Sequence, residues 1–533
     1  MNSEIMVVII GGGVTGAGIL WDLSLRGIKC TLIEKEDLCN GASGRNHGLL
    51  HSGGRYAVED PESADECARE NKILRQLAPW AIEPCGGLFI RLAGDSPEYT
   101  ERWLAGCKAA QVATEPVALA AAYTYCPYLS DDVAEAYLVQ DAAIDVYKLV
   151  RGLVIASRSL GANVMTRTEV IGFIFRGGRI TGVRVRNTSS GFEEVIGCSL
   201  VINAAGAWAG KVAQMAGCRV KVAPDRGILL VFNARLASCV INRLRIPGDG
   251  DILVPSHNVS IFGTTSGITD TIDDQMVKRQ EVEYLLAAGS ELIPGMRDFR
   301  RLRAYAGVRP LLGSDDIADS RNITRTFKVF DHKEGDGVDG FISAVGGKFT
   351  TYRLMAEKTA NLAAAKLGCN KPSFTGSTPI PAPEGTQQAN ASKSFYIFRK
   401  DSRREDRVRQ LICDCEGVTD REILVAAISL PWLTLNELRN RSRFGMGTCQ
   451  GTFCTYRVLG LLIEAGLIQS SEALGLLMDF LKERWKGALP VGSGEQLRET
   501  EFAHALYAYT MGLEFASGRM KGKEFTDATR PGL

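Results

Sequence analysis

Apolar residues at the start of the chain follow two different periods in quick succession. Residues 5–10 form a continuous apolar run, typical of a buried parallel strand, and lead directly into Gly11. Residues 17–26 then carry apolar side chains at helical spacing, and residues 30–33 form a second apolar strand that ends at Glu34. This order of strand, glycine turn, helix and strand predicts an α/β unit at the start of the chain.

Later segments follow the same two periods. Alternating residues predict an antiparallel β-meander over 170–175, 180–186 and 192–196, followed by an apolar strand at 200–204 that rejoins the first sheet. Residues 226–265 also alternate and are expected to form the floor of a substrate domain. Further strands are expected at 134–144 and 341–345, and helices at 61–77, 109–122, 148–160, 275–292 and 352–367.

The composition changes between residues 370 and 391, where Pro, Gly, Ser and Thr become frequent. We interpret this stretch as a semi-extended linker and place the domain boundary there. The predicted organisation is a large split domain at 1–370, a linker at 371–405, a small cysteine-bearing domain at 406–465 and a helical tail at 466–533.

The overall composition is that of an ordinary soluble globular protein, with 533 residues of which 45% are hydrophobic and 23% charged. The formal net charge of +1 gives no overall field that favours nucleic acid or an anionic membrane. The sequence shows neither a signal peptide nor an apolar run of transmembrane length. We therefore expect a cytoplasmic chain that reaches a membrane only as a peripheral protein or through a partner.

The glycines of the first turn have the spacing G-x-G-x-x-G. Gly11 can supply the tight turn, Gly13 lets the backbone approach a pyrophosphate, and Gly16 lets the helix pack closely on the strand. The N-terminus of the helix offers free N–H groups to an anion, and Glu34 can accept from ribose hydroxyls. The turn predicts a dinucleotide site, with a glycine-rich turn in an ordinary α/β domain as the alternative.

Four of the fourteen cysteines form a pattern near the C-terminus. Cys413 and Cys415 make a C-x-C pair, and Cys449 and Cys454 make a C-x4-C pair. Four thiolates brought together need a cation to offset their repulsion, and such sets hold either zinc or an iron–sulfur cluster. The C-x-C half is too tight for the common zinc knuckle, which favours iron–sulfur over zinc or unliganded thiols. The other ten cysteines are scattered and are expected to be reduced core residues.

The residues after the second strand narrow the choice of dinucleotide. Residues 38–56 are dense in small side chains, which an NAD site does not need. They resemble the second flavin-contacting segment of the FAD-dependent amine and hydroxy-acid oxidoreductases. The end of this segment, His51-x-x-x-Arg55-Tyr56, is similar to the FAD-dependent glycerol-3-phosphate dehydrogenases.

Other stretches carry the same resemblance. Residues 201–208 are similar to the strand and turn that cover FAD in this superfamily, residues 303–311 to its arginine-bearing strand, and residues 346–353 to the flavin and substrate motif of the glycerol-3-phosphate branch. Residues 443–451 resemble a 2Fe-2S domain of the bacterioferritin-associated ferredoxin type. The resemblance covers about residues 5–370 and, with the cysteines, is closest to the anaerobic members of the family.

This resemblance implies an α/β fold, α+β overall. An FAD-binding Rossmann-like domain with an inserted antiparallel substrate domain would precede a small helical 2Fe-2S domain. The implied cofactors are FAD and a 2Fe-2S cluster, the latter held by the four patterned cysteines. The implied FAD contacts are Gly11, Gly13, Gly16, Glu34, Lys35, Ser43, Arg45, Asn46, Gly48, Leu49, Val170, Ala204, Gly206, Trp208, Gly347, Lys348 and Thr350.

The resemblance also implies a phosphate site beside the flavin. Arg55, Arg309 and Lys348 lie in motifs that place them there, and an arginine fork matches phosphate or carboxylate. They would hold the phosphate of glycerol 3-phosphate and so present its C2–H to the flavin. Tyr56 is expected to hydrogen-bond the substrate or to pack against it.

A base must accept the hydroxyl proton of the substrate, and histidine is the usual choice near neutral pH. His51 stands where the family motif has its histidine, although a role in packing the cofactor is an equal alternative. His257 is a weaker candidate in the substrate-domain strands. The assignment of the base stays open, and the catalytic candidates are His51, Arg309 and Lys348.

The implied activity is FAD-dependent oxidation of sn-glycerol 3-phosphate to dihydroxyacetone phosphate. Electrons would pass through the 2Fe-2S cluster to partner subunits and a membrane quinone, and NAD or NADP would not accept them. The expected partners are a membrane-anchoring iron–sulfur subunit, on the cytoplasmic side of the inner membrane, together with a second catalytic subunit. Two alternatives remain open, namely an amine, opine or amino-acid dehydrogenase that binds a carboxylate with the same arginines, and a non-catalytic electron-transfer subunit.

Overall fold

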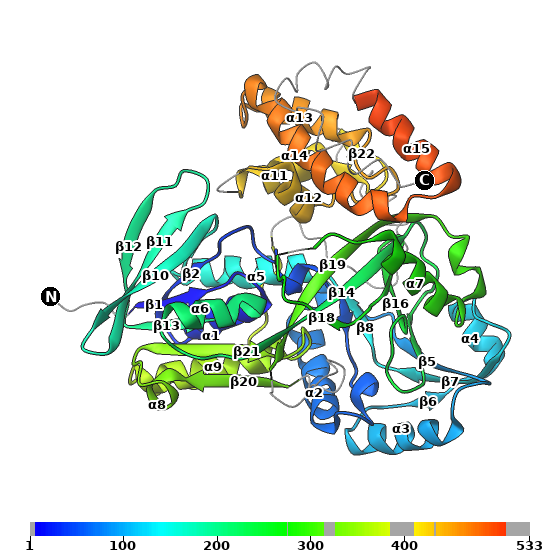
Figure 1. Ribbon diagram of the computed structural model, residues 1–533, viewed down its shortest axis with the longest axis horizontal. Helices are drawn as coiled ribbons and strands as arrows, with labels where there is room; N and C mark the ends of the chain where they lie inside the picture. Colours follow the sequence, from blue (N-terminus) through cyan, green and yellow to red (C-terminus); the bar gives the residue numbers. More distant parts are fainter. Residues whose placement is uncertain (1–5, 274, 314–325, 384–409, 431–432, 508–533) are drawn as a thin grey trace. The chain divides into compact units, whose positions relative to one another are not determined.

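A computed structural model describes residues 6–273, 275–313, 326–383, 410–430 and 433–507 of the chain (Figure 1). The chain divides into two compact units. The first unit holds residues 1–299 and 304–405, and the second holds residues 300–303 and 406–533.

A six-stranded sheet forms the centre of the first unit, in the order β20-β21-β13-β1-β2-β9. All neighbours are parallel except β20, which runs antiparallel to β21. The predicted return of the chain to the first sheet is confirmed, because Val201 of β13 pairs with Val8 of β1. The strands are β1 (Met6–Ile10), β2 (Lys29–Ile33), β9 (Asn163–Met165), β13 (Leu200–Asn203), β20 (Phe327–Asp331) and β21 (Phe341–Gly346).

The described helices of this unit pack around that sheet and around a second sheet. They are α1 (Val14–Leu25), α2 (Pro61–Leu77), α3 (Pro97–Ala109), α4 (Leu119–Tyr125), α5 (Val146–Ser159), α6 (Ala209–Met215), α7 (Arg279–Ser290), α8 (His332–Gly335) and α9 (Tyr352–Lys366). The predicted β-meander is confirmed as a three-stranded sheet of β10 (Thr168–Arg176), β11 (Arg179–Asn187) and β12 (Glu193–Gly197).

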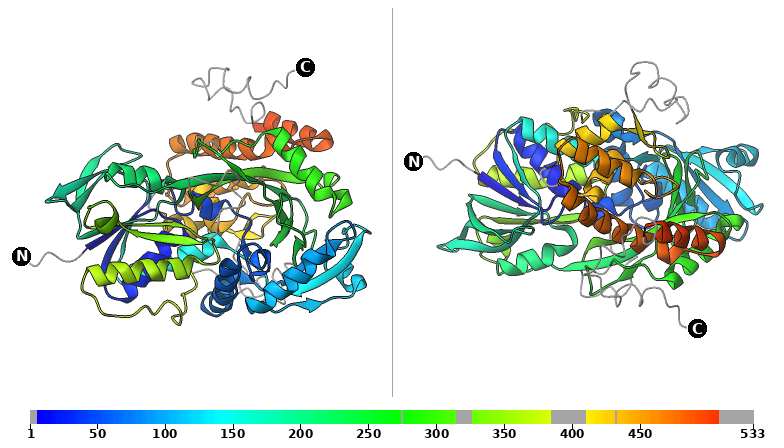
Figure 2. Two further views of the ribbon diagram at one scale, coloured as in Figure 1. Left: turned by 60° about the horizontal axis from the view of Figure 1, so that its bottom comes forward. Right: turned by 90° about the horizontal axis from the view of Figure 1, so that it is seen from above.

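Successive residues of β1 point to opposite faces of the central sheet. Val7 and Ile9 belong to a core that includes residues of α1, α5 and α9. Val8 and Ile10 belong to a second core that includes residues of α6, β10 and β11. The three-stranded sheet, drawn in teal, lies beside the central sheet in Figures 1 and 2. Because both faces are covered, the central strands are apolar throughout.

A second, mostly antiparallel sheet of nine strands confirms the antiparallel insertion expected there, and its role as a substrate domain stays a prediction. Its order is β18-β14-β17-β16-β15-β5-β7-β6, and β19 pairs with β14. A small third sheet joins β3 (Leu49–Leu50), β8 (Ala142–Ile144) and β4 (Ile82–Glu83). The strands of the second sheet are β5 (Gly87–Leu92), β6 (Glu115–Pro116), β7 (Val133–Val139), β14 (Val222–Phe232), β15 (Val240–Arg243), β16 (Ile252–Ser256), β17 (Val259–Gly263), β18 (Gly267–Ile268) and β19 (Arg301–Leu312).

The helix predicted over 109–122 is wrong. The chain instead forms α3, which ends at Ala109, and α4, which begins at Leu119. Ser96 caps the start of α3, and Gln111 adopts a left-handed backbone with φ of 55° just after its end. Pro116 lies in β6 and has no N–H for a helix. These local signals outweigh the helix propensity of the alanines.

Two other predicted elements have different bounds. The helix predicted from residue 275 begins at Arg279, where Glu281 accepts from the backbone N–H of Lys278 at 2.8 Å. The strand predicted over 134–144 is divided into β7 and β8. Between them, Asp141 is buried and accepts from the backbone N–H of Ser52 at 2.7 Å.

The first part of the predicted linker lies in the first unit instead. Ile380 is buried in the same core as α1, and its carbonyl accepts from Trp80 Nε1 at 2.9 Å. Ser373 and Thr375 donate to the buried carboxylate of Asp22 on α1. Residues 384–405, the remainder of the predicted linker, lie outside the described residues.

The second unit is mainly helical. Its described elements are β22 (Leu411–Cys413), β23 (Val418–Thr419), α11 (Asp420–Ile428), α12 (Leu435–Ser442), α13 (Cys454–Glu464), α14 (Ser470–Ala488) and α15 (Gly494–Ala505). Phe480 of α14 stacks on Phe444, with ring centroids 5.8 Å apart, inside the core that also buries Cys413 and Cys454. The start of the predicted tail therefore shares its core with the cysteine-bearing segment.

None of the helices among the described residues combines the length and the apolar character needed to cross a membrane.

Candidate active site and cysteine cluster

The first glycine turn joins β1 to α1 with almost no room for side chains. Gly11 has φ of +114°, and a Cβ there would lie 2.5 Å from the carbonyl oxygen of Ala204. A Cβ on Gly16 would lie 2.0 Å from the carbonyl oxygen of Gly11, so only glycine lets α1 approach the strand. Gly13 is the N-cap residue of α1 and has no side chain that could accept from the first N–H groups of the helix. The turn and helix start therefore fit a pyrophosphate.

Two acceptors outside the turn hold it in place. Glu34, at the end of β2, accepts from the backbone N–H of Gly12 at 2.6 Å and of Glu36 at 2.9 Å. Burial raises the pKa of this carboxyl, and the two N–H donors oppose that rise. Ser43 Oγ accepts from the backbone N–H of Val14 at 3.0 Å, at the first turn of α1. Each oxygen of the Glu34 carboxylate can still accept a hydrogen bond from a ribose hydroxyl.

The small-residue segment is fixed by its own side chains and by β19. Asn46 donates to the carbonyl of Ser43 at 2.7 Å and accepts from the N–H of Gly48 at 2.7 Å. Tyr305 of β19 donates to the carbonyl of Asn46 at 3.0 Å. A Cβ on Gly307 would lie 2.6 Å from the carbonyl oxygen of Arg45, so β19 packs directly on this backbone.

A separate group of implied FAD residues lies at the end of β13. Trp208 follows the turn there, and its Nε1 donates to Asp273 at 2.9 Å. Lys35, just after β2, places Nζ 4.4 Å from the centroid of the Trp208 ring. Gly206 has φ of +56°. Val170, by contrast, is buried in the core between the central sheet and the three-stranded sheet.

The implied substrate residues His51, Tyr56 and Lys348 lie together. The His51 backbone N–H donates to Thr350 Oγ1 at 3.0 Å, which ties the two motifs to each other. The rings of His51 and Tyr56 are 5.2 Å apart, and Lys348 Nζ lies 5.1 Å from the centroid of the Tyr56 ring. Lys348 also donates to Ser63 Oγ at 2.7 Å. Tyr56 therefore packs between a histidine and a cation.

The sequence reasoning missed His47, whose ring lies 6.1 Å from that of His51. Burial, with smaller contributions from the charges of Arg309 and Arg55, lowers the pKa of His47 to about 4. Its Nδ1 is buried and has no hydrogen-bond partner among the described residues. No signal in the sequence distinguished His47 from a packing residue, because its burial arises only in the fold.

Burial also holds the pKa of His51 well below its usual range, with smaller contributions from His47, Arg55 and Lys348. The three implied cations therefore lie close enough to a pair of buried histidines to act on their charge. We call His47, His51, Arg55, Arg309 and Lys348 the histidine–cation cluster. Both histidines are neutral at neutral pH and can accept a proton.

Buried carboxylates fix both arginines of this cluster, and the sequence reasoning missed these carboxylates. Arg309 Nε lies 2.7 Å from Asp225 Oδ2, and its NH2 donates to the carbonyl of Thr265 at 2.6 Å. Arg55 NH2 lies 2.9 Å from Asp251 Oδ2. The side chains of Asp225 and Asp251 are both 0% exposed. His257, the weaker candidate base, instead lies with Nε2 3.8 Å from Asp145 at the start of α5.

In the second unit the four patterned cysteines are gathered at one place. Cys415 and Cys449 have sulfurs 3.6 Å apart. A hydrogen bond from Cys454, and backbone N–H groups of Gly445 and Glu416, lower the pKa of Cys413 to about 7. Four thiols at this spacing, with backbone N–H groups directed at the sulfur of Cys413, fit an iron–sulfur cluster.

Two family models match the chain, one in each unit. Residues 6–357 match the FAD dependent oxidoreductase family, and residues 411–464 match the BFD-like [2Fe-2S] binding domain. The chain is 41% identical to the A subunit of anaerobic glycerol-3-phosphate dehydrogenase from Escherichia coli strain K12, over 95% of this chain and 97% of the relative. The chain belongs to the family of these A subunits. The A1 subunit of the Haloferax volcanii enzyme is 37% identical over 96% of this chain and 91% of its own length.

A solved structure agrees with the fold of this family. The glycerol-3-phosphate dehydrogenase from Bacillus halodurans complexed with FAD has a TM-score of 0.64 and 20% identity, and the match covers 92% of this chain and 97% of that one. The expected fold is confirmed, with an FAD-dependent oxidoreductase domain and a helical 2Fe-2S domain. FAD and a 2Fe-2S cluster are the cofactors, rather than NAD or zinc. Which residues contact them stays a prediction.

Proposed function

We propose that this chain oxidises sn-glycerol 3-phosphate to dihydroxyacetone phosphate. The observation that supports this most is the histidine–cation cluster, which combines two neutral histidines with three cations next to the predicted flavin site. The name of the E. coli relative agrees with this assignment. A dianionic phosphate requires several cations, and the alcohol requires a neutral base, so the cluster supplies both needs.

In this proposal Arg55, Arg309 and Lys348 hold the phosphate. The arginines keep fixed positions through Asp251 and Asp225, so each guanidinium can present a fork to phosphate oxygens. The substrate hydroxyl donates to His51 or His47, which removes its proton as the C2–H leaves as hydride. Bound FAD supplies the two-electron acceptor.

The residues proposed to hold FAD fall into three groups. The glycine turn with Glu34 and Ser43 takes the pyrophosphate and ribose end. The small-residue segment under β19 and the motif around Thr350 take the flavin end. Lys35 and the turn from Ala204 to Trp208 complete the set, whereas the side chain of Val170 is buried in the core.

We further propose that the cysteine cluster carries electrons from the flavin to partners. Flavin receives two electrons together, whereas a 2Fe-2S cluster takes one at a time. The relatives are named as A subunits, which supports a complex of several subunits. In this proposal a second catalytic subunit joins the complex, together with a membrane-anchoring iron–sulfur subunit that delivers electrons to a quinone at the cytoplasmic side of the inner membrane.

One anaerobic titration tests the substrate and the electron path together. Glycerol 3-phosphate should bleach the flavin absorbance and produce the electron paramagnetic resonance signal of a reduced 2Fe-2S cluster. Proline and other amino or imino acids, tested in parallel, should do neither. Bleaching by an imino acid but not by glycerol 3-phosphate would move the assignment to the amino-acid dehydrogenases. A bleached flavin beside a cluster that stays oxidised would contradict the electron path.

A further inference from the structure

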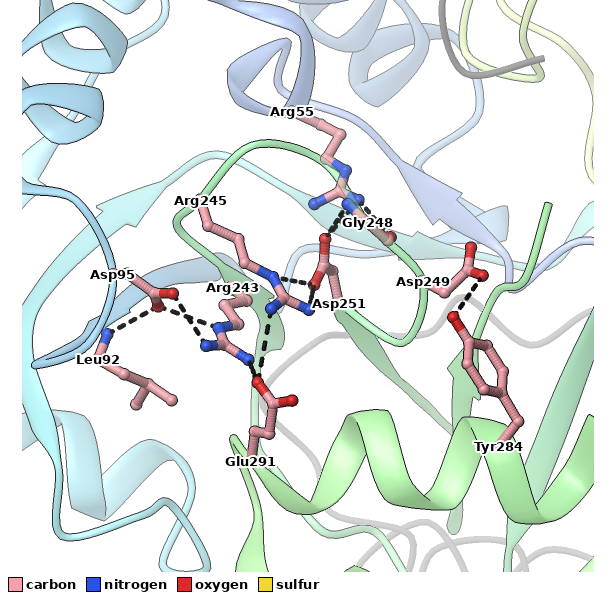
Figure 3. Close-up of polar contacts among 10 residues, drawn as sticks. All are labelled: Arg55, Leu92, Asp95, Arg243, Arg245, Gly248, Asp249, Asp251, Tyr284 and Glu291. Carbon is pink, nitrogen blue, oxygen red and sulfur yellow. Dashed lines mark hydrogen bonds and ion pairs between the residues drawn. The ribbon is translucent and has the colours of Figure 1, made fainter. Parts of the chain in front are cut away.

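Six charged side chains of alternating sign form a chain that ends at Arg55 (Figure 3). Asp251 lies 2.9 Å from Arg55 and 3.0 Å from Arg245. Glu291, at the C-terminal end of α7, contacts both Arg245 and Arg243. Arg243 closes the chain with a two-nitrogen contact to Asp95, at 3.0 and 2.9 Å. The three carboxylates balance the three arginines, so the whole chain is close to neutral.

Asp251 is the most constrained member of this chain. Its side chain is 0% exposed, and Oδ2 accepts from the backbone N–H of Gly248 at 2.6 Å as well as from Arg55. Its own carbonyl accepts from the backbone N–H of Arg243 at 2.9 Å. Asp251 directly precedes β16, so the second sheet fixes the position of the carboxylate.

Arg55 is held at one corner only. Its NH2 nitrogen donates to Asp251 Oδ2 at 2.9 Å and to the carbonyl of Gly248 at 3.2 Å. Among the described residues these are the hydrogen bonds found for its guanidinium. A guanidinium carries five N–H donors, so the other edge remains for a ligand. The charge of this guanidinium lowers the pKa of both His47 and His51, so Arg55 lies near the histidines of the histidine–cation cluster.

We infer that Asp251 is a positioning residue that fixes the Arg55 guanidinium for the substrate phosphate. This inference rests on the proposed function, because it needs a phosphate at the histidine–cation cluster. Asp251 has two opposite effects on an anion. The negative charge of Asp251 repels phosphate. Its hydrogen bond to Arg55, however, restricts the arginine side chain before phosphate binds, so that less rotational freedom is lost on binding. Positioning outweighs repulsion, because Arg245 already offsets the charge of the same carboxylate.

The sign of one measurement separates the two effects. Inorganic phosphate is titrated into the FAD-loaded full chain as a competitor of glycerol 3-phosphate in flavin bleaching. Asp251→Asn should weaken phosphate binding at least tenfold, because Arg55 loses its orientation. Glu291→Gln makes the same chemical change in the same series of charged side chains, but Glu291 does not contact Arg55. Phosphate affinity of this variant should therefore stay within twofold of the wild type. Equal or tighter phosphate binding in Asp251→Asn would overturn the inference.

A double-mutant cycle shows whether Asp251 acts through Arg55. In an Arg55→Gln background, Asp251→Asn should cause no further loss of phosphate binding, and a loss as large as in the wild type would overturn the inference.

If Asp251→Asn does not retain FAD, Asp251→Glu replaces it. The longer side chain keeps the charge but displaces the contact, so phosphate binding should again fall, and unchanged binding would count against positioning. If glycerol 3-phosphate does not bleach the flavin of the wild-type protein, the proposed function itself is refuted.

Discussion

The glycine turn and the histidine–cation cluster belong to the same unit but are built in opposite ways. The turn is local: backbone atoms leave no room for a Cβ at Gly11 or Gly16, and the binding groups are backbone N–H groups. The cluster is assembled from distant segments, and its charges are held by carboxylates of the second sheet, Asp225 in β14 and Asp251 just before β16. The turn therefore depends on steric exclusion, whereas the cluster depends on buried ion pairs.

The largest expected effect comes from a substitution that breaks the turn. Gly16→Ala places a Cβ 2.0 Å from the Gly11 carbonyl oxygen, which is backbone and cannot move aside. We expect a loss of roughly 3 kcal/mol or more in the free energy of unfolding, together with loss of FAD. Thermal melting and the FAD-to-protein ratio measure both. Gly172→Ala is the matched control, because a Cβ there meets nothing within 4 Å. A Gly16→Ala protein with full FAD and wild-type melting would show that the turn tolerates the clash.

The local construction of the turn explains why it could be predicted. Strand, glycines, helix and Glu34 occur within one short stretch, and the fold follows that order. The four cysteines were also predictable, since their spacing is itself the signal, and the structure gathers them. That these residues contact FAD and the cluster stays a prediction, but the geometry around them agrees with it.

The cluster was only half predictable, for the same physical reason. Its arginines and Lys348 were found through motif resemblance, but Asp225 and Asp251 were not. No sequence spacing links Asp225 to Arg309 or Asp251 to Arg55. Each pair is distant in the sequence and comes together only in the folded protein. The failed helix over 109–122 has a similar cause, since alanine content was weighed above Pro116 and the cap at Ser96.

A substitution in the cluster should spare the bound flavin but reduce turnover. Arg309→Ala removes one fork from the phosphate, and we expect kcat/KM for glycerol 3-phosphate to fall about 100-fold, or about 2.7 kcal/mol. FAD content should stay at the wild-type level, in contrast to Gly16→Ala. Arg297→Ala, which breaks an exposed pair with Glu283, is the control. An unchanged kcat/KM in Arg309→Ala would place the phosphate elsewhere.

The smallest expected effect sharpens the comparison through the pH dependence that His47 gives the cluster. His47 has a pKa of about 4 in the folded protein, against 6.5 for an unperturbed histidine. Between these values the unfolded chain binds more protons than the folded chain, so stability rises with pH. The contribution is fully present above about pH 6.5 and is lost as the pH falls towards 4.

We expect this loss to be roughly 2 kcal/mol for His47, less than the full shift implies, because its side chain is not completely enclosed. The charges of Arg309 and Arg55 act in the same direction as burial, so moderate salt should reduce the effect only slightly. Melting temperatures of the wild type and of His47→Gln, measured between pH 7 and 4, provide the test. The variant should lose part of the pH slope, whereas His257→Gln, on the turn between β16 and β17, should keep it. If the melting temperature depends on pH in the same way in all three proteins, protonation of His47 does not destabilise the fold. The proposed role of His47 as a neutral proton acceptor would then be wrong.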